Sequence, residues 1–310
     1  MTAMSSSLRT IFMGTPEIAV PALRLLAART QVLRVVTQPD RPAGRGQKLQ
    51  PSAVKQAALE LGLPVWQPET LKGAEGAAEL QGADLFVVMA YGELLRQPVL
   101  DLPPGGCLNL HGSLLPRWRG ASPLQAAIRA GDRDSGVSVM RMVRALDAGG
   151  VYLEERMSLD DRPTLPWLHD RLAEIAAVAL GRALDVWPTL TAVPQDESLV
   201  THCRKLTDED AHLDFNRGLD ELDRWIRAYV PAPGCWAFCD GSEGERLRIH
   251  AAEPRTCEPC QPGTVRVVGR EFQVGCGDGW LALTRVQSPN KKAIDAADWL
   301  NGNRPPSRLM

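Results

Sequence analysis

An asparagine and a histidine stand two residues apart at the end of an apolar run, as Asn109 and His111 in the stretch Cys-Leu-Asn-Leu-His-Gly. Because side chains alternate along a strand, both project to the same side of a strand that ends at His111. An amide N–H beside an imidazole can bind a carbonyl oxygen and stabilise the negative charge that develops on it. The residues alone also allow a polar pair that merely caps the strand.

A carboxylate follows downstream, Asp147 in the stretch Leu-Asp-Ala-Gly-Gly, in a predicted turn between two strands. Such a carboxylate could orient His111, hold it protonated and take a proton from an attacking amine. The alternative is a turn aspartate that binds its own backbone. Only the combination of the three side chains favours a catalytic role over these alternatives, and neither a metal nor a covalent enzyme intermediate is expected.

The elements that must position these residues alternate between short apolar runs and helical periodicity. Strands are expected over residues 8–13, 32–36, 84–89, 106–111, 137–142 and 151–157, and helices from Glu17 and over 52–61, 123–129 and 165–187. This order predicts an α/β fold with a Rossmann-like, mainly parallel sheet and helices on both faces. Ligands of such sheets bind at the carboxyl ends of the strands, where His111 would lie. The first turn, Gly14-Thr15-Pro16, lacks the glycine pattern of dinucleotide-binding enzymes.

The pattern of predicted helices and strands changes near Thr207. A helix over 219–228 is followed by five short β runs, at 236–238, 246–251, 263–268, 272–276 and 280–286. They predict a small C-terminal β-barrel of the OB-like kind, which often binds oligonucleotides. We therefore expect a catalytic domain over 1–189, a linker over 190–206 and a β-barrel domain over 207–310.

The composition and charge of the chain narrow the class of protein to which it can belong. The 310 residues are 44% hydrophobic and 23% charged with a net charge of −2, which is typical of a globular protein. Without a global basic field, any nucleic acid must be bound by a local patch. The N-terminal residues MTAMSSSLRT contain no apolar core of a signal peptide, and no stretch approaches the roughly 20 apolar residues of a membrane helix. The expected location is the cytoplasm.

Seven cysteines occur in the chain, and reduced thiols are expected. Two close pairs, Cys235 with Cys239 and Cys257 with Cys260, have a spacing that four zinc ligands could use. The alternative is that the first pair packs as small apolar residues on a strand and the second lies in a Pro-rich loop. The sequence leaves both interpretations open, including that of a zinc-stabilised nucleic-acid adaptor.

Residues 109–123 read Asn-Leu-His-Gly-Ser-Leu-Leu-Pro-Arg-Trp-Arg-Gly-Ala-Ser-Pro, and Asp-Ala-Gly follows at 147–149. This combination resembles the formyltetrahydrofolate-dependent formyltransferases. The resemblance implies that Asn109, His111 and Asp147 are the catalytic residues and that 10-formyltetrahydrofolate is the co-substrate. It also implies a folate-binding loop formed by Ser113, Leu114, Leu115 and Pro116.

A second motif at residues 37–49 reads Thr-Gln-Pro-Asp-Arg-Pro-Ala-Gly-Arg-Gly-Gln-Lys-Leu. It resembles an insertion found in the branch of this family that formylates methionyl initiator tRNA. Arg41, Arg45 and Lys48 lie among Gly and Pro, in a loop expected to be mobile and able to contact an RNA acceptor end through phosphates and stacking. The resemblance places Arg45 against the tRNA and implies that the barrel over 207–310 also binds tRNA. A solvated basic loop is the alternative.

The expected function is transfer of the formyl group of 10-formyltetrahydrofolate to the amino group of methionyl initiator tRNA, giving formylmethionyl-tRNA for translation initiation. The expected partners are that tRNA and folate, without DNA or membrane, and the expected state is a monomer. One alternative is a formyltransferase that acts on a UDP-linked amino sugar, which would share the triad but lack the insertion. A non-catalytic RNA-binding module is another, although it need not retain all three catalytic residues.

Overall fold

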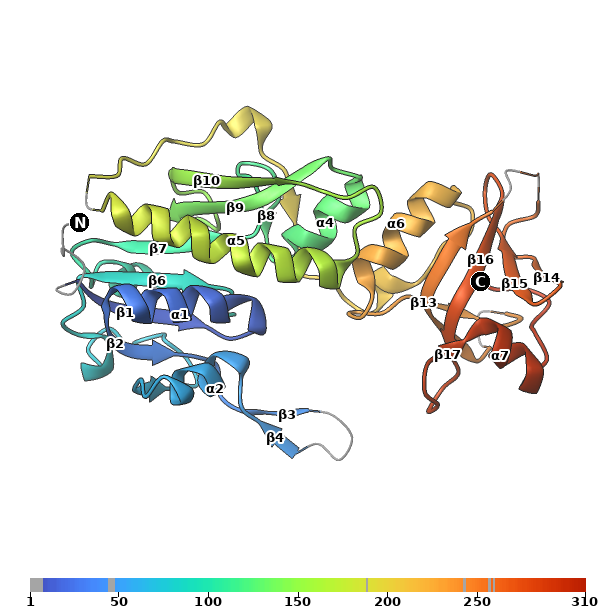
Figure 1. The fold of residues 1–310 in the computed structure, drawn as a ribbon, viewed down its shortest axis with the longest axis horizontal. Helices are drawn as coiled ribbons and strands as arrows, with labels where there is room; N and C mark the ends of the chain where they lie inside the picture. The colour runs from blue at the N-terminus through green and yellow to red at the C-terminus, as the bar shows by residue number, and fades with distance from the viewer. Residues whose placement is uncertain (1–7, 44–47, 188, 242–243, 256–257, 259) are drawn as a thin grey trace. The chain divides into compact units, whose positions relative to one another are not determined.

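The structure is a computed structural model that describes residues 8–43, 48–187, 189–241, 244–255, 258 and 260–310 (Figure 1). Its contacts divide the chain into two compact units, between which the chain passes several times. Unit 1 comprises Met1–Pro123, Asp134–Ser158 and His169–Cys203. Unit 2 comprises Leu124–Arg133, Leu159–Leu168 and Arg204–Met310. The domain boundaries expected at residues 189 and 207 stay a prediction.

Unit 1 is built on a seven-stranded sheet with the order β10-β9-β7-β6-β1-β2-β5. The five strands from β7 to β5 are parallel to one another. Strand β9 pairs antiparallel with β7, and β10 pairs antiparallel with β9, so that β10 again runs in the direction of the five. The predicted mainly parallel sheet is therefore confirmed. The strands are β1 (Arg9–Gly14), β2 (Gln31–Val36), β5 (Val65–Trp66), β6 (Leu85–Met89), β7 (Cys107–His111), β9 (Asp134–Arg141) and β10 (Val151–Ser158).

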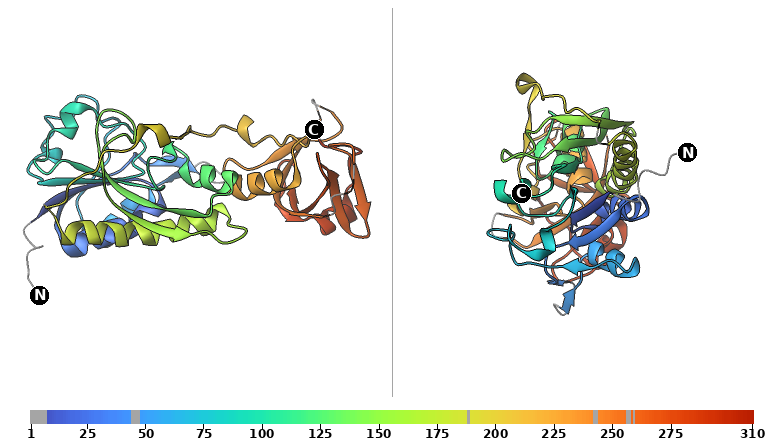
Figure 2. Two further views of the ribbon diagram at one scale, coloured as in Figure 1. Left: turned by 90° about the horizontal axis from the view of Figure 1, so that it is seen from above. Right: turned by 90° about the vertical axis from the view of Figure 1, so that its left-hand side faces the viewer.

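Both faces of this sheet are covered, which explains why its central strands are apolar on both sides. The helices α1 (Val20–Arg29) and α5 (Leu165–Asp185) lie side by side over one face (Figures 1 and 2). On the other face, alternate strand residues such as Ile11 and Phe86 pack in one cluster with Leu80 and Val99. Those two residues come from η2 (Ala78–Leu80) and α3 (Gln97–Leu100), and α2 (Ala53–Glu60) packs against α1.

The first helix begins later than predicted. Residues Glu17–Ala19 form a single 3-10 turn, η1, with Pro16 at its cap, and α1 starts at Val20. The reason is Pro21, which has no N–H to donate to the turn before it and is tolerated only in the first turn of an α-helix. The helix therefore restarts around that proline.

The stretch expected to be a mobile loop contains a β-hairpin. Strands β3 (Arg41–Ala43) and β4 (Lys48–Gln50) pair antiparallel, with Arg41 opposite Gln50, and the hairpin stands away from the sheet (Figures 1 and 2). Its tip, residues 44–47 with Arg45, lies outside the described residues. The three-residue strands Arg-Pro-Ala and Lys-Leu-Gln are too short to carry an alternating apolar pattern, so the sequence did not indicate them.

Unit 2 contains α4 (Pro123–Ala130) apart from its first residue, α6 (Leu219–Tyr229) and an antiparallel sheet of order β12-β13-β16-β15-β14, with β17 beside β16. The chain end closes this sheet: Phe238 and Met310 exchange backbone hydrogen bonds at one edge, and Val265 N–H donates to Ser307 O at the other. The predicted small barrel is confirmed. Its further elements are η4 (Glu209–Ala211), β12 (Trp236–Phe238), β13 (Arg246–Pro254), β14 (Val265–Val268), β15 (Glu271–Gly275), β16 (Trp280–Gln287), β17 (Ile294–Asp295) and α7 (Ala296–Gly302).

In the described part of the chain, no helix combines the length and apolar character that crossing a bilayer requires.

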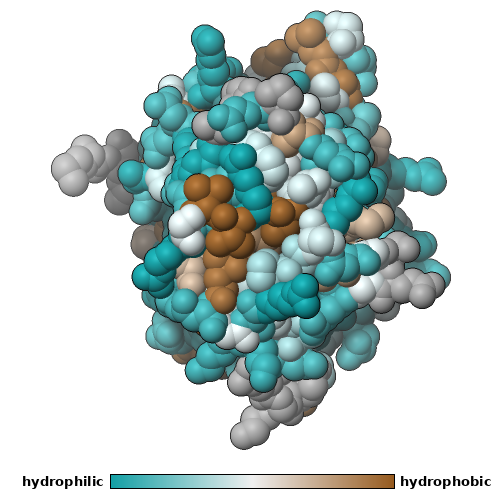
Figure 3. Space-filling view, turned by 90° about the vertical axis from the view of Figure 1, so that its right-hand side faces the viewer, coloured by the Kyte–Doolittle hydropathy of each residue, from teal (hydrophilic) through white to brown (hydrophobic). Residues whose placement is uncertain are grey.

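Figure 3 shows one face of the molecule, on which hydrophilic residues surround a small hydrophobic area. Exposed hydrophobic side chains of unit 2 include Val267 and Val268 of β14. This face is therefore mostly hydrophilic, with limited apolar exposure.

Candidate active site

The three predicted catalytic side chains meet at the carboxyl end of β7. Asn109 and His111 lie on that strand, and Asp147 lies in the turn between β9 and β10. Asp147 Oδ1 is 3.5 Å from Asn109 Nδ2, and Asp147 Oδ2 is 3.7 Å from His111 Nδ1. Well-formed hydrogen bonds of this kind measure about 2.7–3.2 Å. The group is thus close enough for electrostatic contact and can tighten when a substrate binds.

The orientation of the His111 ring is set by the backbone. Its Nε2 lies 2.9 Å from the carbonyl oxygen of Trp118. Because a carbonyl can only accept, Nε2 carries a proton and donates it. The ring is 6% exposed, so few other orientations are open to it. Nδ1 is thereby turned toward Asp147 and is the nitrogen left for a reacting group.

The Asp147 carboxylate is held by the same loop, because Gly120 N–H donates to its Oδ2 at 2.9 Å. Asp147 and Trp118 have backbone φ values of +50° and +64°. For residues with a Cβ, this left-handed conformation costs on the order of 1–3 kcal/mol and is concentrated at functional sites. Asp147 belongs to the triad and Trp118 contacts His111. Backbone strain at these two residues supports a functional role for the loops that carry them.

Gly120 is required by close packing between two short strands. Strand β8 (Arg119–Gly120) pairs with β11 (His202–Cys203), and Gly120 has a φ of +122°. A Cβ at this position would lie 2.0 Å from the carbonyl oxygen of Cys203. In addition, Thr201 Oγ1 accepts a hydrogen bond from Trp118 N–H at 2.9 Å. Residues 201–203 therefore fix the loop that orients His111 and Asp147.

Cys203 contributes a neutral thiol to this arrangement. Burial raises the pKa of Cys203, and the negative charge of Asp147 raises it further. Its S–H donates to the carbonyl oxygen of Trp118 at 3.3 Å. A protonated thiol that donates to the backbone packs the loop and does not serve as a nucleophile.

The predicted folate loop, residues 113–116, follows His111 directly. Ser138 on β9 donates from Oγ to Ser113 O at 2.8 Å and accepts from Leu115 N–H at 3.0 Å. Ser113 Oγ in turn donates to Arg117 O at 2.7 Å, and Ser138 itself is completely buried. The backbone of the loop is thereby fixed, while its contact with folate stays a prediction.

Two arginines of this loop, Arg117 and Arg119, are candidates to add positive charge beside the triad. Arg119 instead is 5% exposed and binds Glu197 at 2.8 Å and Gln195 at 2.9 Å. Its hydrogen bond lowers the pKa of Glu197. The guanidinium of Arg117 stacks over the Trp118 ring at 4.3 Å from its centroid. The charge of Arg119 is therefore neutralised inside the fold.

The residues predicted to bind tRNA are placed only in part. Arg41 is exposed and donates to Gln38 Oε1 at 3.4 Å. Lys48 belongs to β4, but its side chain and the whole of Arg45 lie outside the described residues. Next to the hairpin, Asp40 accepts hydrogen bonds from Lys55 Nζ at 2.7 Å and from Gln67. The bond from Lys55 is the main reason why the pKa of Asp40 is lowered.

The cysteines proposed as zinc ligands are packed as protonated thiols where they are described. Burial raises the pKa of Cys235 to about 12 and that of Cys239 to about 11. Cys260 S–H donates to Gly279 O at 3.0 Å, and Cys257 lies outside the described residues. Among the residues that the structure covers, no three His, Cys, Asp or Glu side chains gather as metal ligands. The described thiols thus fit the apolar interpretation.

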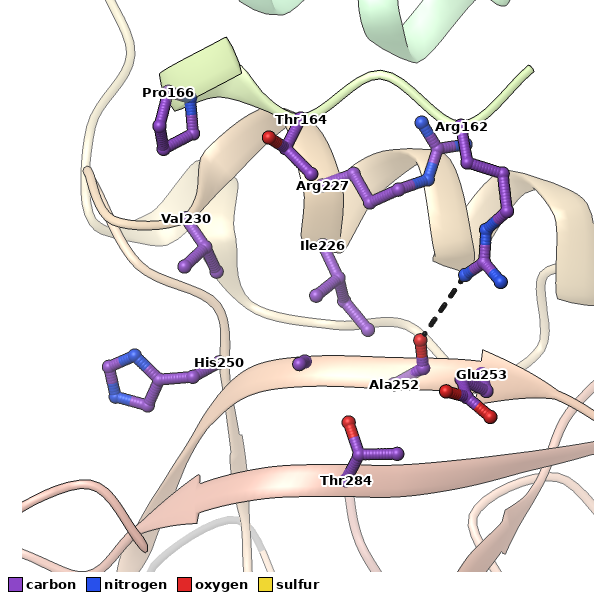
Figure 4. Close-up of a pocket in the computed structure, with 11 residues that line it drawn as sticks. Arg162, Thr164, Pro166, Ile226, Arg227, Val230, His250, Ala252, Glu253 and Thr284 are labelled. Carbon is purple, nitrogen blue, oxygen red and sulfur yellow. Dashed lines mark hydrogen bonds between the residues drawn. The ribbon is translucent and has the colours of Figure 1, made fainter. Parts of the chain in front are cut away.

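Unit 2 has a cavity of about 400 Å³ between α6, β13 and residues 162–166 (Figure 4). Its apolar wall includes Ile226, and its basic groups include Arg162 and Arg227. Both guanidinium groups bind the carboxylate of Asp223, at 2.6 and 2.9 Å. Arg162 also donates to Ala252 O. Both arginines of this cavity thus pair with one buried carboxylate, and the cavity shares no residue with the triad.

Most of the groups that hold the triad have no signal in the sequence. Trp118 acts through its carbonyl and Gly120 through its N–H, and neither backbone group has a side-chain signature. Ser138 had a signal, because it is the one polar residue in the run Val-Ser-Val-Met of β9. Gln195 lies in the stretch interpreted as a linker, where a single glutamine indicates nothing by itself.

Two family models match this chain. Residues 9–184 match the family described as "Formyl transferase", and residues 205–304 match "Formyl transferase, C-terminal domain". The chain is 47% identical to the methionyl-tRNA formyltransferase of Stutzerimonas stutzeri (strain A1501), over 97% of this chain and 96% of that protein. It is 46% identical to the one of Thiobacillus denitrificans (strain ATCC 25259 / T1), over 95% of this chain and 96% of that protein.

Among solved structures, HypX from Aquifex aeolicus in complex with tetrahydrofolic acid aligns with a TM-score of 0.64 at 18% identity. The alignment covers 95% of this chain and 47% of that one, and at this identity it shows a likeness of fold alone. The family matches span both units and include all three residues at the carboxyl end of β7. The chain therefore belongs to the formyl transferase family.

Proposed function

We propose that this protein transfers the formyl group of 10-formyltetrahydrofolate to the amino group of methionyl initiator tRNA, in the cytoplasm, for translation initiation. The observation that carries the proposal is the meeting of Asn109, His111 and Asp147 at the carboxyl end of β7. The acceptor is supported by relatives at 46–47% identity that are named methionyl-tRNA formyltransferase. The folate is supported by the family and by a fold neighbour solved with tetrahydrofolic acid.

Asn109 and His111 act as donors to the formyl oxygen. Because the Nε2 proton of His111 is committed to Trp118 O, donation to substrate comes from Nδ1 and requires the protonated ring. The carboxylate of Asp147, 3.7 Å from Nδ1, stabilises that imidazolium. Two fixed donors aimed at an oxygen that becomes negative lower the barrier to attack.

Asp147 also receives the proton of the attacking amine, directly or through one water. A bond forms between the amine nitrogen and the formyl carbon, and the bond from that carbon to the folate nitrogen breaks. The electron pair of the broken bond stays on the folate nitrogen, which takes up the proton that Asp147 received, so that the carboxylate is restored. Gly120 N–H holds one carboxylate oxygen of Asp147, and the other faces Asn109 at the reacting centre.

Substrate binding is assigned to the two loops that flank this centre. The backbone of residues 113–116, fixed by Ser138, binds the folate. Arg41, Arg45 and Lys48 of the hairpin bind the acceptor end of the tRNA through its phosphates. Holding two large substrates together supplies much of the rate, since effective molarities reach about 10⁵ M or more. A UDP-linked amino sugar is not favoured as acceptor, because the relatives at 46–47% identity act, by name, on tRNA.

The test is formyl transfer from 10-formyltetrahydrofolate to methionyl initiator tRNA, run beside a UDP-linked amino sugar as acceptor. We expect transfer to the tRNA, and a rise in KM for tRNA in Arg45→Ala. Arg24→Ala is the matched control, because Arg24 is an exposed arginine of α1 that pairs with Glu60. Transfer to the sugar alone would leave the triad chemistry in place and overturn the acceptor. Equal KM values in the two variants would overturn the role of Arg45.

A further inference from the structure

A segment near the end of unit 1, residues 193–203, runs along both loops that build the catalytic centre. At one end, Val193 and Val151 exchange backbone hydrogen bonds of 2.8 Å. At the other end, β11 pairs with β8. Between them, the side chain of Gln195 reaches the turn that carries Asp147.

One amide binds the catalytic turn on both sides of its central residue. Gln195 Nε2 donates to the carbonyl oxygen of Asp147 at 2.8 Å and to that of Gly149 at 2.7 Å. The turn has little freedom on its other side, because a Cβ at Gly149 would lie 1.8 Å from Arg141 O. Gln195 therefore holds Asp147 in its left-handed conformation, with a φ of +50°.

Arg119 sets which way this amide points. Its Nε donates to Gln195 Oε1 at 2.9 Å. A guanidinium has only donors, so the oxygen of the amide must face Arg119 and the nitrogen must face the two carbonyls. The remaining nitrogens of Arg119 bind both oxygens of Glu197, at 2.8 and 3.2 Å. The chain of contacts thus links the loop around residues 118–120 to the turn around Asp147.

We propose that Gln195, oriented by Arg119, is a positioning residue that holds the Asp147 carboxylate at its reacting distance from Asn109 and His111. Gln195 does not contact substrate and acts through the backbone of the catalytic turn. The inference rests on the proposed role of Asp147 in formyl transfer. It predicts a loss in turnover that is not shared by substrate binding, because the folate loop and the hairpin are held by other residues.

The test variant is Gln195→Glu, which keeps the shape of the side chain but replaces the donor with an oxygen that repels two carbonyls. We expect kcat to fall about 10²-fold, which is the loss that a displacement of a catalytic group by about 1 Å can cause. KM for both substrates should stay within twofold of wild type. Gln81→Glu is the control, because Gln81 Nε2 also donates to two carbonyls, Glu75 O at 2.8 Å and Ala77 O at 3.4 Å. The control should leave kcat unchanged.

Gln195→Ala, Arg119→Met and their double variant supply the second measurement. Because both residues act on the same turn, the double variant should lose no more kcat than the worse single variant. Two outcomes would overturn this inference alone. One is that the losses in kcat add in the double variant. The other is that Gln195→Glu and Gln195→Ala keep kcat within threefold of wild type while Asp147→Asn is inactive. Full activity of Asp147→Asn would instead overturn the catalytic role of Asp147, and this inference with it.

Discussion

His111 Nε2 donates to the carbonyl oxygen of Trp118 at 2.9 Å, so the imidazole is oriented by the loop that follows it in the chain. Two residues later, the same loop supplies Gly120 N–H to the carboxylate of Asp147. One backbone segment therefore orients two of the three proposed catalytic side chains. Substitutions that displace this segment should reduce turnover even though they remove no catalytic group.

Gly120→Ala is the most direct displacement of that segment. Its Cβ would lie 2.0 Å from Cys203 O at a φ of +122°, so β8 and β11 must separate. We expect kcat to fall about tenfold or more, together with a lower Tm. Gly62→Ala is the control, since Gly62 has a φ of +68° but nothing within 4 Å of its Cβ. Gly62→Ala should lower the free energy of unfolding by about 1 kcal/mol and leave kcat unchanged. Unchanged turnover in Gly120→Ala would contradict the account.

Ser138→Ala tests how the folate loop is held. The variant leaves the buried Ser113 O and Leu115 N–H without the partner they share. We expect a loss of about 1–3 kcal/mol in the free energy of unfolding and a higher KM for 10-formyltetrahydrofolate. Ser158→Ala, which removes an exposed hydroxyl bonded to Asp134, should change neither. A normal KM in a destabilised Ser138→Ala would show that the loop does not contact folate.

Asp40, which lies next to the hairpin, makes a pH-dependent contribution to the free energy of unfolding. Its hydrogen bond from Lys55 lowers its pKa in the folded state. Its contribution to stability is therefore fully present above the unfolded pKa of about 3.9 and is lost as the pH falls through the lower folded value. Urea midpoints should show Asp40→Asn less stable than wild type at pH 7, with the difference shrinking below about pH 4. A difference of equal size at both pH values would speak against this ion pair.

Part of the site could be predicted from local patterns. The spacing of Asn109 and His111, with Gly112 after them, indicated two polar side chains on one side of a strand end. Buried runs such as Leu85–Met89 predicted the parallel sheet, because strands covered on both faces are apolar throughout. Asp147 could be joined to the pair only by family resemblance, since its approach depends on the pairing of β7 with β9.

The rest depends on backbone groups and on contacts distant in sequence. The carbonyl of Trp118 and the N–H of Gly120 exist at every such position of a chain, so only the folded loop reveals their use. Gln195 lies 48 residues from Asp147, and no local pattern connects the two. The barrel likewise closes through Met310 and Phe238, a pairing that alternation along single strands cannot predict.

The central claim, that the carboxylate of Asp147 takes part in formyl transfer, is tested most directly by Asp147→Asn. An amide oxygen can still accept the hydrogen bond from Gly120 N–H, so the loop should keep its shape. In a single turnover with saturating 10-formyltetrahydrofolate and methionyl initiator tRNA, we predict a rate about 10²–10⁴-fold below wild type, with both substrates bound within threefold of wild type. A single-turnover rate within threefold of wild type would contradict the account.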